Sequence, residues 1–224
     1  IRHSQLTLSP YVNLIIGDNA AGKSSVLEAV HILSTGRSFR TSRIQDVIQH
    51  EINHILVAAK LKLDSYTQSY PLGIQKTAKS THIRINHQDV KQQSELSRHV
   101  PFAVIHPETL SLITGGPAIR RALVDWVAFY RCVEFYDLWK NYQRVLQQRN
   151  ACLRDSKQRY ALGYWTEQLV SLLPPLWLKR QQSLTWLEQG LQRYHSLIQS
   201  LGKIELKLST GFPAYLDAMN SEDL

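Results

Sequence analysis

The chain has 224 residues, 43% of them hydrophobic, which is enough for one large or two small packed domains and excludes a wholly disordered protein. Its net charge of +8 and pI near 9.5 favour an anionic partner, with nucleic acid as the first candidate. The apolar runs are too short to cross a bilayer, so no membrane partner is expected. The two cysteines lack metal-ligand or redox spacing and no secretory signal is visible, which together indicate the cytoplasm.

The first elements surround a glycine-rich loop. A first strand is predicted to end at residues 6–8, and the apolar, β-branched run at residues 11–16 predicts a second strand. Residues 17–24 then fit the pattern G-x-x-x-x-G-K-[ST], which cradles phosphates. Residues 25–33 predict a helix that Gly36 ends. The apolar face of this helix is expected to consist of Val26, Leu27, Val30 and Leu33.

Each residue type in this loop suits the binding of a triphosphate. Backbone N–H groups of the loop and of the first helical turn converge on the anion, and the helix dipole adds partial positive charge. Lys23 is expected to reach the β- and γ-phosphates, and the Ser24 hydroxyl to take one Mg²⁺ coordination position. Nothing in the loop distinguishes ATP from GTP, and an ordinary turn before an amphipathic helix is the alternative. The predicted cofactor residues are Gly17, Asp18, Asn19, Ala20, Ala21, Gly22, Lys23, Ser24 and Ser25.

The rest of the first half alternates in the manner of strands. A basic segment at residues 37–43 leads to a short amphipathic piece at residues 44–48. A buried strand is expected at residues 102–105. Between them, three runs separated by turn residues predict a β-meander or side sheet, at residues 54–63, 69–75 and 81–86.

From Pro107 onward the periodicity is helical. A short helix is expected to end at Gly115-Gly116, and Pro117 starts another. Two longer segments with a seven-residue apolar rhythm predict an antiparallel pair of helices, either a coiled-coil projection or an ordinary helical core. The apolar positions of the first segment are Phe135, Leu138, Tyr142, Val145 and Leu153, and those of the second are Leu184, Leu187, Leu191, Tyr194, Ile198 and Leu201. Pro174-Pro175 is expected to kink or break the second of these helices. Residues 203–210 alternate again and predict a strand that returns to the sheet, which would make the helical pair an insertion.

Three ordered blocks resemble the bacterial RecF family of recombination mediators. The first joins the phosphate loop and its helix to Gly36-Arg37-Ser38-Phe39-Arg40. The second runs from Pro107-Glu108-Thr109 through Gly115-Gly116-Pro117 and Arg120-Arg121 to Asp125-Trp126, and the third is Val145 to Ala151. Ala20 stands where many relatives carry glycine, a difference that is tolerable if this residue keeps a negative φ.

The resemblance implies an α/β fold: part of a P-loop, ABC-type ATPase head related to SMC proteins, with an inserted helical, coiled-coil-like arm. Residues 1–106 would be the ATPase lobe with the phosphate loop and a β-rich side sheet. Residues 107–202 would be the helical arm lobe, and residues 203–224 the truncated strand that returns to the head. Because the chain opens on Ile1 rather than Met, we expect an N-terminal fragment.

The resemblance also implies a function. In this family ATP joins two heads into a DNA-bound dimer and hydrolysis releases it. RecF-like proteins act with RecR and RecO at single-stranded or gapped DNA and help RecA to load there. The family's signature serine and acidic strand end are missing, because Leu123-Val124-Asp125 lies in a helical pattern and Gln189-Gly190 lacks the serine. We therefore assign no catalytic residue and expect binding of ATP and Mg²⁺ at most, with weak DNA-dependent ATPase activity left to the full-length protein.

Several cations outside the loop have two interpretations each. In SMC-like heads an arginine after the loop helix can approach the nucleotide phosphates, so Arg37 and Arg40 join the predicted cofactor residues, with solvated charge as the equal alternative. Arg120 and Arg121 begin a helix, where an ion pair with Asp125 is preferred to a DNA phosphate. The cations of the arm either contact DNA or remain solvated. They are Lys140, Arg144, Arg149, Arg154, Lys157 and Arg159.

Two other functions remain open. A small-molecule kinase uses the same loop, but it requires an acidic catalytic group and an acceptor pocket and leaves the arm unexplained. An ABC transporter subunit would need a membrane partner and a glutamine loop, and residues 104–112 contain no glutamine.

Overall fold

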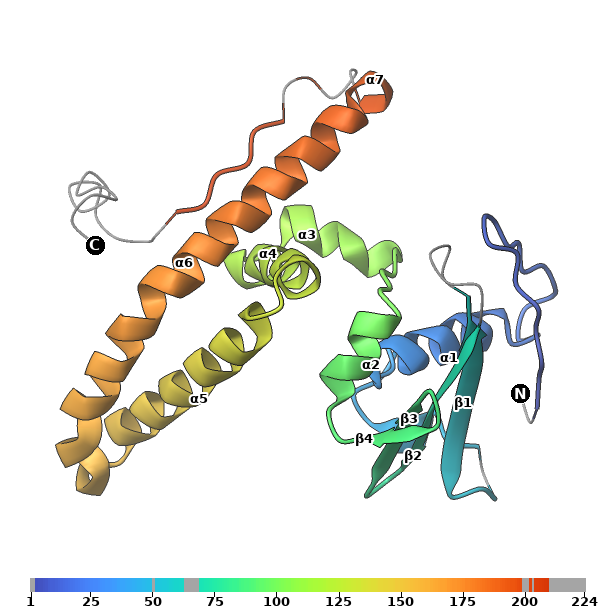
Figure 1. The fold of residues 1–224 in the computed structure, drawn as a ribbon, viewed down its shortest axis with the longest axis horizontal. Coiled ribbons are helices and arrows are strands. Elements are labelled where there is room, and N and C mark those ends of the chain that lie inside the picture. The colour runs from blue at the N-terminus through green and yellow to red at the C-terminus, as the bar shows by residue number, and fades with distance from the viewer. Residues whose placement is uncertain (1–2, 50, 63–68, 199–201, 203, 210–224) are drawn as a thin grey trace. The chain divides into compact units, whose positions relative to one another are not determined.

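The computed structural model describes residues 3–49, 51–62, 69–198, 202 and 204–209. The chain divides into two compact units, Ile1–His106 and Pro107–Leu224. The first is a sheet covered by helices, and the second is helical (Figure 1). None of the helices in these ranges combines the length and the apolar character of a membrane span.

Four antiparallel strands form the sheet of the first unit and lie in chain order. They are β1 (His54–Leu61), β2 (Tyr70–Thr77), β3 (Thr81–Ile85) and β4 (Gln88–Val90). The three predicted strands are confirmed, whereas β4 was not predicted. The sequence signal for this strand is the turn that precedes it. Asn86 and His87 form that turn and have φ values of 49° and 65°. Positive φ at both loop positions is the conformation of a type I′ hairpin turn, which Asn favours.

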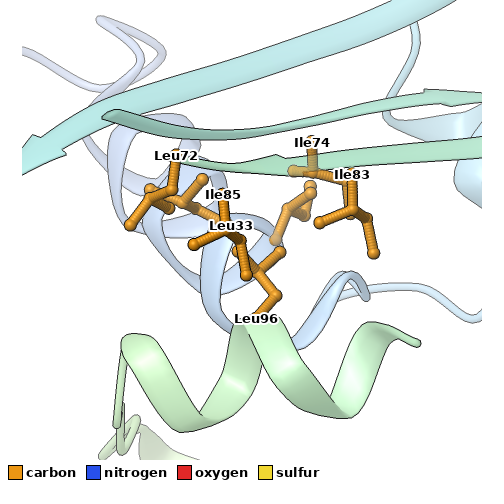
Figure 2. Packing of buried hydrophobic residues seen from close by; sticks show 7 residues of the cluster. Leu33, Leu72, Ile74, Ile83, Ile85 and Leu96 are labelled. Carbon is orange, nitrogen blue, oxygen red and sulfur yellow. The ribbon is translucent and has the colours of Figure 1, made fainter. Parts of the chain in front are cut away.

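One face of this sheet packs against two helices, α1 (Lys23–Thr35) and α2 (Gln93–His99) (Figure 2). Ile74 lies directly opposite Ile83 across β2 and β3, and each buried side chain of this kind contributes about 1.5–3 kcal/mol. His82 is exposed on the other face, because successive side chains of a strand point to opposite faces of the sheet. The core residues are at most 8% exposed: Ile32, Leu33, Leu72, Ile74, Ile83, Ile85 and Leu96.

The helix after the glycine-rich loop ends where the sequence predicts. Gly36 has a φ of 63° and its N–H donates to the carbonyl oxygen of Ile32 at 2.7 Å, an ending that favours glycine. The predicted apolar face is only partly correct, because Leu33 is buried but Leu27 is 49% exposed. The buried residues of α1 concentrate in its second half, where the sheet and α2 cover it. They are Glu28, Ile32, Leu33 and Ser34.

Three strand predictions in the first unit are wrong. Residues 3–16, which include the expected strands at 6–8 and 11–16, form no strand, and Tyr11 and Ile16 are 92% and 82% exposed. Residues 102–105 also form no strand, and Ile105 is 90% exposed. A strand needs a neighbour to satisfy its backbone N–H and C=O groups, and no described segment pairs with these residues. Residues 44–48 contain a short 3₁₀ turn, η1 (Ile44–Asp46).

The second unit consists of helices. Its first part contains η2 (Pro107–Leu110), α3 (Ser111–Thr114) and α4 (Pro117–Arg131), with Pro117 at the start of α4 as predicted. The long pair that follows, α5 (Phe135–Arg154) and α6 (Leu162–Arg193), lies side by side and is joined by η3 (Ser156–Ala161) (Figure 1). The short α7 (His195–Ile198) follows. The predicted helical pair is therefore formed.

The seven-residue rhythm predicts the packing face of α5 correctly over most of the helix but not near its C-terminal end. Phe135 and Val145 are each 2% exposed, as the pattern predicts. Near the end of the helix, however, Cys152 is buried and the predicted Leu153 is 45% exposed. Pro174 and Pro175 do not break α6, which continues through both. Packing of α6 against α4 and α5, with Leu176 at 1% exposure beside the prolines, offsets the lost hydrogen bonds.

A partly buried ion pair joins α4 to α6. Arg180 donates from Nε to Oδ1 of Asp125 at 2.7 Å and from Nη2 to Oδ2 at 2.9 Å, and the two side chains are 14% and 17% exposed. Burial acts to lower the pKa of Arg180, but the hydrogen bond and charge of Asp125 outweigh it and raise this pKa. From the sequence we predicted that Asp125 forms an ion pair with Arg120 or Arg121, and this prediction is wrong.

Arg120 has a different role at the start of α4. Its Nη1 donates to the carbonyl oxygen of Gly115 at 2.8 Å and, at 3.4 and 3.5 Å, to those of Ile113 and Leu112. These carbonyls belong to the end of α3, which lacks intrahelical donors for them. Arg120 therefore caps a helix, while Arg121 is exposed.

Residues 204–209, at the end of the described chain, form no strand. The other residues of the segment expected to return to the head, 203 and 210–224, lie outside the described residues. Its return to the head stays a prediction.

The ion pair between Asp125 and Arg180 predicts a specific loss of stability. Asp125→Asn leaves a largely buried guanidinium without its counter-charge and is expected to lower the free energy of unfolding by about 2–3 kcal/mol, measured by urea denaturation. Glu167→Gln, an exposed acid on α6, is the matched control and should change it by less than about 0.5 kcal/mol. Equal stability of the two variants would contradict the role of the pair.

Candidate nucleotide-binding site

The glycine-rich loop presents the open start of α1. Gly22 precedes the helix with a φ of 91°, no side chain caps the helix, and its first turn contains no acidic residue. The N–H of Val26 makes the first helical bond, to the carbonyl oxygen of Gly22 at 3.1 Å. The N–H groups of residues 23–25 precede it and have no acceptor inside the helix. Such a turn is prepared for an anion.

Two glycines of the loop meet a conformational requirement. Gly17 and Gly22 have φ values of 156° and 91°, which residues with a Cβ rarely adopt. A Cβ on Gly17 would also lie 3.3 Å from that of Ala21. Between them, the N–H of Ala21 donates to the carbonyl oxygen of Asp18 at 3.2 Å and closes a turn. The pattern that predicted the loop therefore corresponds to backbone geometry.

Ala20 does not keep the negative φ that its tolerance required. Its φ is 66°, in the left-handed region where a Cβ approaches the following carbonyl oxygen. This conformation costs about 1 kcal/mol for a residue other than glycine. The sequence could not reveal this cost, because it depends on the turn that the neighbouring residues form.

Lys23 folds back over the loop. Its Nζ donates to the carbonyl oxygens of Gly17 at 2.6 Å and of Asp18 at 2.7 Å. Both acceptors belong to the main chain, and Lys23 forms no ion pair with any residue that the structure describes. No described carboxylate therefore neutralises this ammonium, which belongs to the first residue of the uncapped helix.

The site fits Mg²⁺ only in combination with phosphate. The Ser24 side chain is exposed in the first turn of α1, where its hydroxyl is available as one ligand. Over the ranges that the structure covers, no group of three His, Cys, Asp or Glu residues is suited to a metal ion. Mg²⁺ characteristically binds through few protein ligands, several waters and substrate phosphates, so a single hydroxyl suits it.

Glu28 is a buried acid of this helix that the sequence did not single out. It is 6% exposed, its Oε1 accepts a hydrogen bond from Oγ of Ser38, and its Oε2 lies 3.6 Å from Nη1 of Arg40. The sequence offered no signal for its burial, because Glu28 lies opposite the apolar face predicted for this helix. Through these contacts Glu28 holds the segment after α1 against the helix.

The structure does not bring the two predicted arginines into one cavity with the loop. Arg37 is exposed, and Arg40 is held by Glu28. Both line a cavity of about 560 Å³ formed by residues 36–42, Ile44 and Lys76, which includes none of residues 17–25. A cofactor role for Arg37 and Arg40 stays a prediction.

Comparison with known proteins identifies the family. The family model described as the RecF/RecN/SMC N terminal domain matches residues 1–124, more than half of the chain. The chain belongs to this family. The match includes the phosphate loop, α1 and the whole side sheet, so the predicted resemblance is confirmed.

Curated relatives bear one name, DNA replication and repair protein RecF. The relative from Thioalkalivibrio sulfidiphilus is 39% identical over 165 residues, covering 74% of this chain and 46% of its own length. The relative from Haemophilus ducreyi is 40% identical over 168 residues, covering 75% of this chain and 46% of its own length. The relative from Shewanella woodyi is 35% identical over 210 residues, covering 93% of this chain and 56% of its own length. The chain thus spans about half the length of these relatives.

Solved structures show the same fold. A structure described as the recombination mediator protein RecF-ATPrS in the RecFOR pathway has a TM-score of 0.71 and 24% identity, over 82% of this chain and 51% of its own. One described as RecF-ATP has a TM-score of 0.70 and 23% identity, over 85% and 55%. The predicted fold class, a partial ABC-type ATPase head with a helical arm, is confirmed.

The conformation of Ala20 gives a testable consequence. Ala20→Gly removes the Cβ from a left-handed position, which relieves about 1–2 kcal/mol of strain but loses about 0.4–1 kcal/mol because glycine makes the unfolded chain more flexible. The free energy of unfolding in urea denaturation is therefore expected to rise, by up to about 1 kcal/mol. Ala21→Gly, one residue later and without a positive φ, is the matched control. It is expected to lower stability by about 0.4–1 kcal/mol because glycine makes the unfolded chain more flexible. The same sign for both variants would refute the strain at Ala20.

Proposed function

We propose that this chain binds the phosphates of ATP, together with Mg²⁺, at the start of α1, as the nucleotide-binding part of a DNA repair and recombination mediator. The observation that carries the proposal is the uncapped first turn of α1, which includes Lys23, an ammonium bonded only to main-chain carbonyls and without a carboxylate partner among the described residues. Backbone N–H groups and a cation are gathered there at the positive end of a helix.

Lys23 changes its acceptors when nucleotide binds. Its Nζ now donates to the neutral carbonyl oxygens of Gly17 and Asp18. A β- or γ-phosphate oxygen offers a charged acceptor, and such hydrogen bonds are roughly twice as strong as neutral ones. The exchange therefore favours the bound state, while the Ser24 hydroxyl supplies one ligand to the Mg²⁺ that bridges the phosphates.

A kinase function is less well supported. A kinase needs an acidic group that accepts a proton from the acceptor substrate. Glu28, the buried acid of α1, is already engaged by Ser38 and Arg40. The fold class and the names of the relatives favour the repair function instead.

For the whole protein we propose the partners that its family resemblance implies. The curated relatives are named DNA replication and repair proteins, and the net charge of +8 suits a polyanionic partner. We propose binding to single-stranded or gapped DNA, action with RecR- and RecO-type mediators, and an ATP-dependent homodimer that assists RecA loading in the cytoplasm. We assign no hydrolysis to this chain.

Nucleotide binding is tested by removing the ammonium. Lys23→Ala is expected to lower the affinity for fluorescent ATP at least about tenfold in the presence of Mg²⁺, because a hydrogen bond to a charged group contributes about 1.5–3 kcal/mol. Lys91→Ala, an exposed lysine with the same charge, is the control and should leave the affinity unchanged. Equal affinity of the Lys23→Ala and parent proteins would reject the proposed site.

DNA binding is tested by its salt dependence. The protein, with ATP present, is expected to bind gapped DNA with an affinity that falls steeply between about 50 and 200 mM salt, because each neutralised phosphate releases counterions. Fluorescence anisotropy at several salt concentrations measures the slope. Absence of binding at the lowest salt would reject the repair function while leaving the nucleotide site intact.

A further inference from the structure

The turn that joins the two long helices exposes aromatic side chains. We call this surface the arm tip and define it as residues 153–165, which comprise the end of α5, η3 and the start of α6 (Figure 1). Tyr160 is 89% exposed and Tyr164 is 58% exposed, with the ring of Trp165 edge-on to that of Tyr164 at a centroid distance of 5.0 Å. Neither tyrosine belongs to the hydrophobic core of the second unit, so packing does not account for aromatic residues at these positions.

Hydrogen bonds hold the arm tip in place. Asp155 accepts from the N–H of Lys157 at 3.0 Å through Oδ1, and from Nε2 of Gln158 at 2.9 Å through Oδ2. Nε of Arg149 donates to Oγ1 of Thr166 at 3.1 Å and joins α5 to α6 beside the turn. The tyrosines are therefore carried on an ordered turn, which lowers the entropy cost of binding a ligand.

The arm tip carries an excess of positive charge. It contains three cations and one acid. Arg154, Lys157 and Arg159 are exposed, and none of them belongs to an ion pair in the parts of the chain that the structure describes. The acid, Asp155, uses both carboxylate oxygens as acceptors inside the turn. The arm tip therefore offers cations to an anionic ligand.

Exposed rings and exposed cations in one turn suit a nucleic acid strand with unpaired bases. The cations contact phosphates, and each unpaired base offers a π-face on which an aromatic side chain can stack. In a duplex the bases stack on one another and present only their edges in the grooves. An acidic protein segment would also attract the cations, but its carboxylates would leave the two tyrosines without a stacking partner.

We propose that the arm tip binds unpaired nucleotides of DNA, with its two tyrosines stacking on bases and its three cations contacting phosphates. The proposal rests on the DNA binding proposed above, and it adds where and how the strand is held. The arm tip lies wholly in the second unit, whereas the phosphate loop belongs to the first. The two sites therefore use separate residues.

The test removes the rings without changing the charge. The variant carries Tyr160→Leu and Tyr164→Leu, and its matched control is Tyr194→Leu, because Tyr194 is 62% exposed at the other end of α6. The probes are a fluorescent oligothymidylate and a hairpin duplex with the same number of phosphates. Anisotropy measures both affinities in the presence of ATP and Mg²⁺. Both rings are exposed, so the variant is expected to fold as the parent does.

The double leucine variant is expected to lose at least about fivefold in affinity for oligothymidylate and less than about twofold for the duplex. A fivefold loss corresponds to about 1 kcal/mol, the lower end of the range for one base stacked on an aromatic ring. Tyr160→Phe with Tyr164→Phe keeps both rings and should bind as the parent does, as should Tyr194→Leu.

The cations are tested by the salt dependence of the same binding. Lys157→Gln together with Arg159→Gln is expected to weaken binding of oligothymidylate. It should also lower the salt slope by about 1.4, or about 0.7 for each lost phosphate contact of a single strand. An unchanged slope would reject phosphate contacts at the arm tip.

Three results with the leucine variant would overturn the proposal. The first is unchanged affinity for oligothymidylate while the parent protein binds gapped DNA, which would leave the DNA binding proposed above intact. The second is an equal loss for both probes, because the rings would then not distinguish unpaired bases. The third is tighter binding of the parent to an oligoglutamate than to oligothymidylate of equal charge, lost in the variant, which would assign the arm tip to an acidic protein.

Discussion

The start of α1 carries main-chain N–H groups that the helix itself cannot satisfy, and the function proposed for the first unit depends on these groups. In most proteins a Ser, Thr, Asp or Asn side chain would accept from one of them. Here Gly22 stands at that position, with Lys23 as the next residue. A capping side chain would compete with a ligand for the same donors, and glycine in its place costs a few tenths of a kcal/mol, roughly, of helix stability. The free donors point to an anion as the missing acceptor.

The second half of α1 offsets this cost. Ile32 and Leu33 pack against the sheet and α2, and Gly36 closes the helix with its own N–H. Most helical stability in proteins comes from such tertiary packing rather than from the ends. The helix is thus anchored at one end, which leaves the other free for the loop.

Sequence reasoning succeeded where the determinants are local. The helix after the glycine-rich loop, the glycine that ends α1, the three longer strands and the start of α4 each depend on neighbouring residues, and each was predicted correctly. The hairpin turn at Asn86 also depends on neighbouring residues, but it was not predicted. The family followed from ordered blocks of residues, which no single motif could have identified.

Sequence reasoning failed where the determinant is a distant partner. The runs at 11–16 and 102–105 have strand-like composition, but no described strand pairs with them. Asp125 could be paired from sequence only with the arginines one turn away, whereas its partner Arg180 lies 55 residues further along. Lys76 likewise reaches the cavity only through the fold of the sheet.

The exposed run before the phosphate loop has a consequence for the behaviour of the protein in solution. Residues 11–16 contain one asparagine, no charge and no proline, and their apolar side chains are open to water. Such a segment can template intermolecular β-pairing and drive self-association. Mutual repulsion of molecules that each carry a charge of +8 opposes this at low ionic strength, and added salt screens the repulsion. Colloidal stability therefore sets an upper limit on protein concentration in any measurement at high salt.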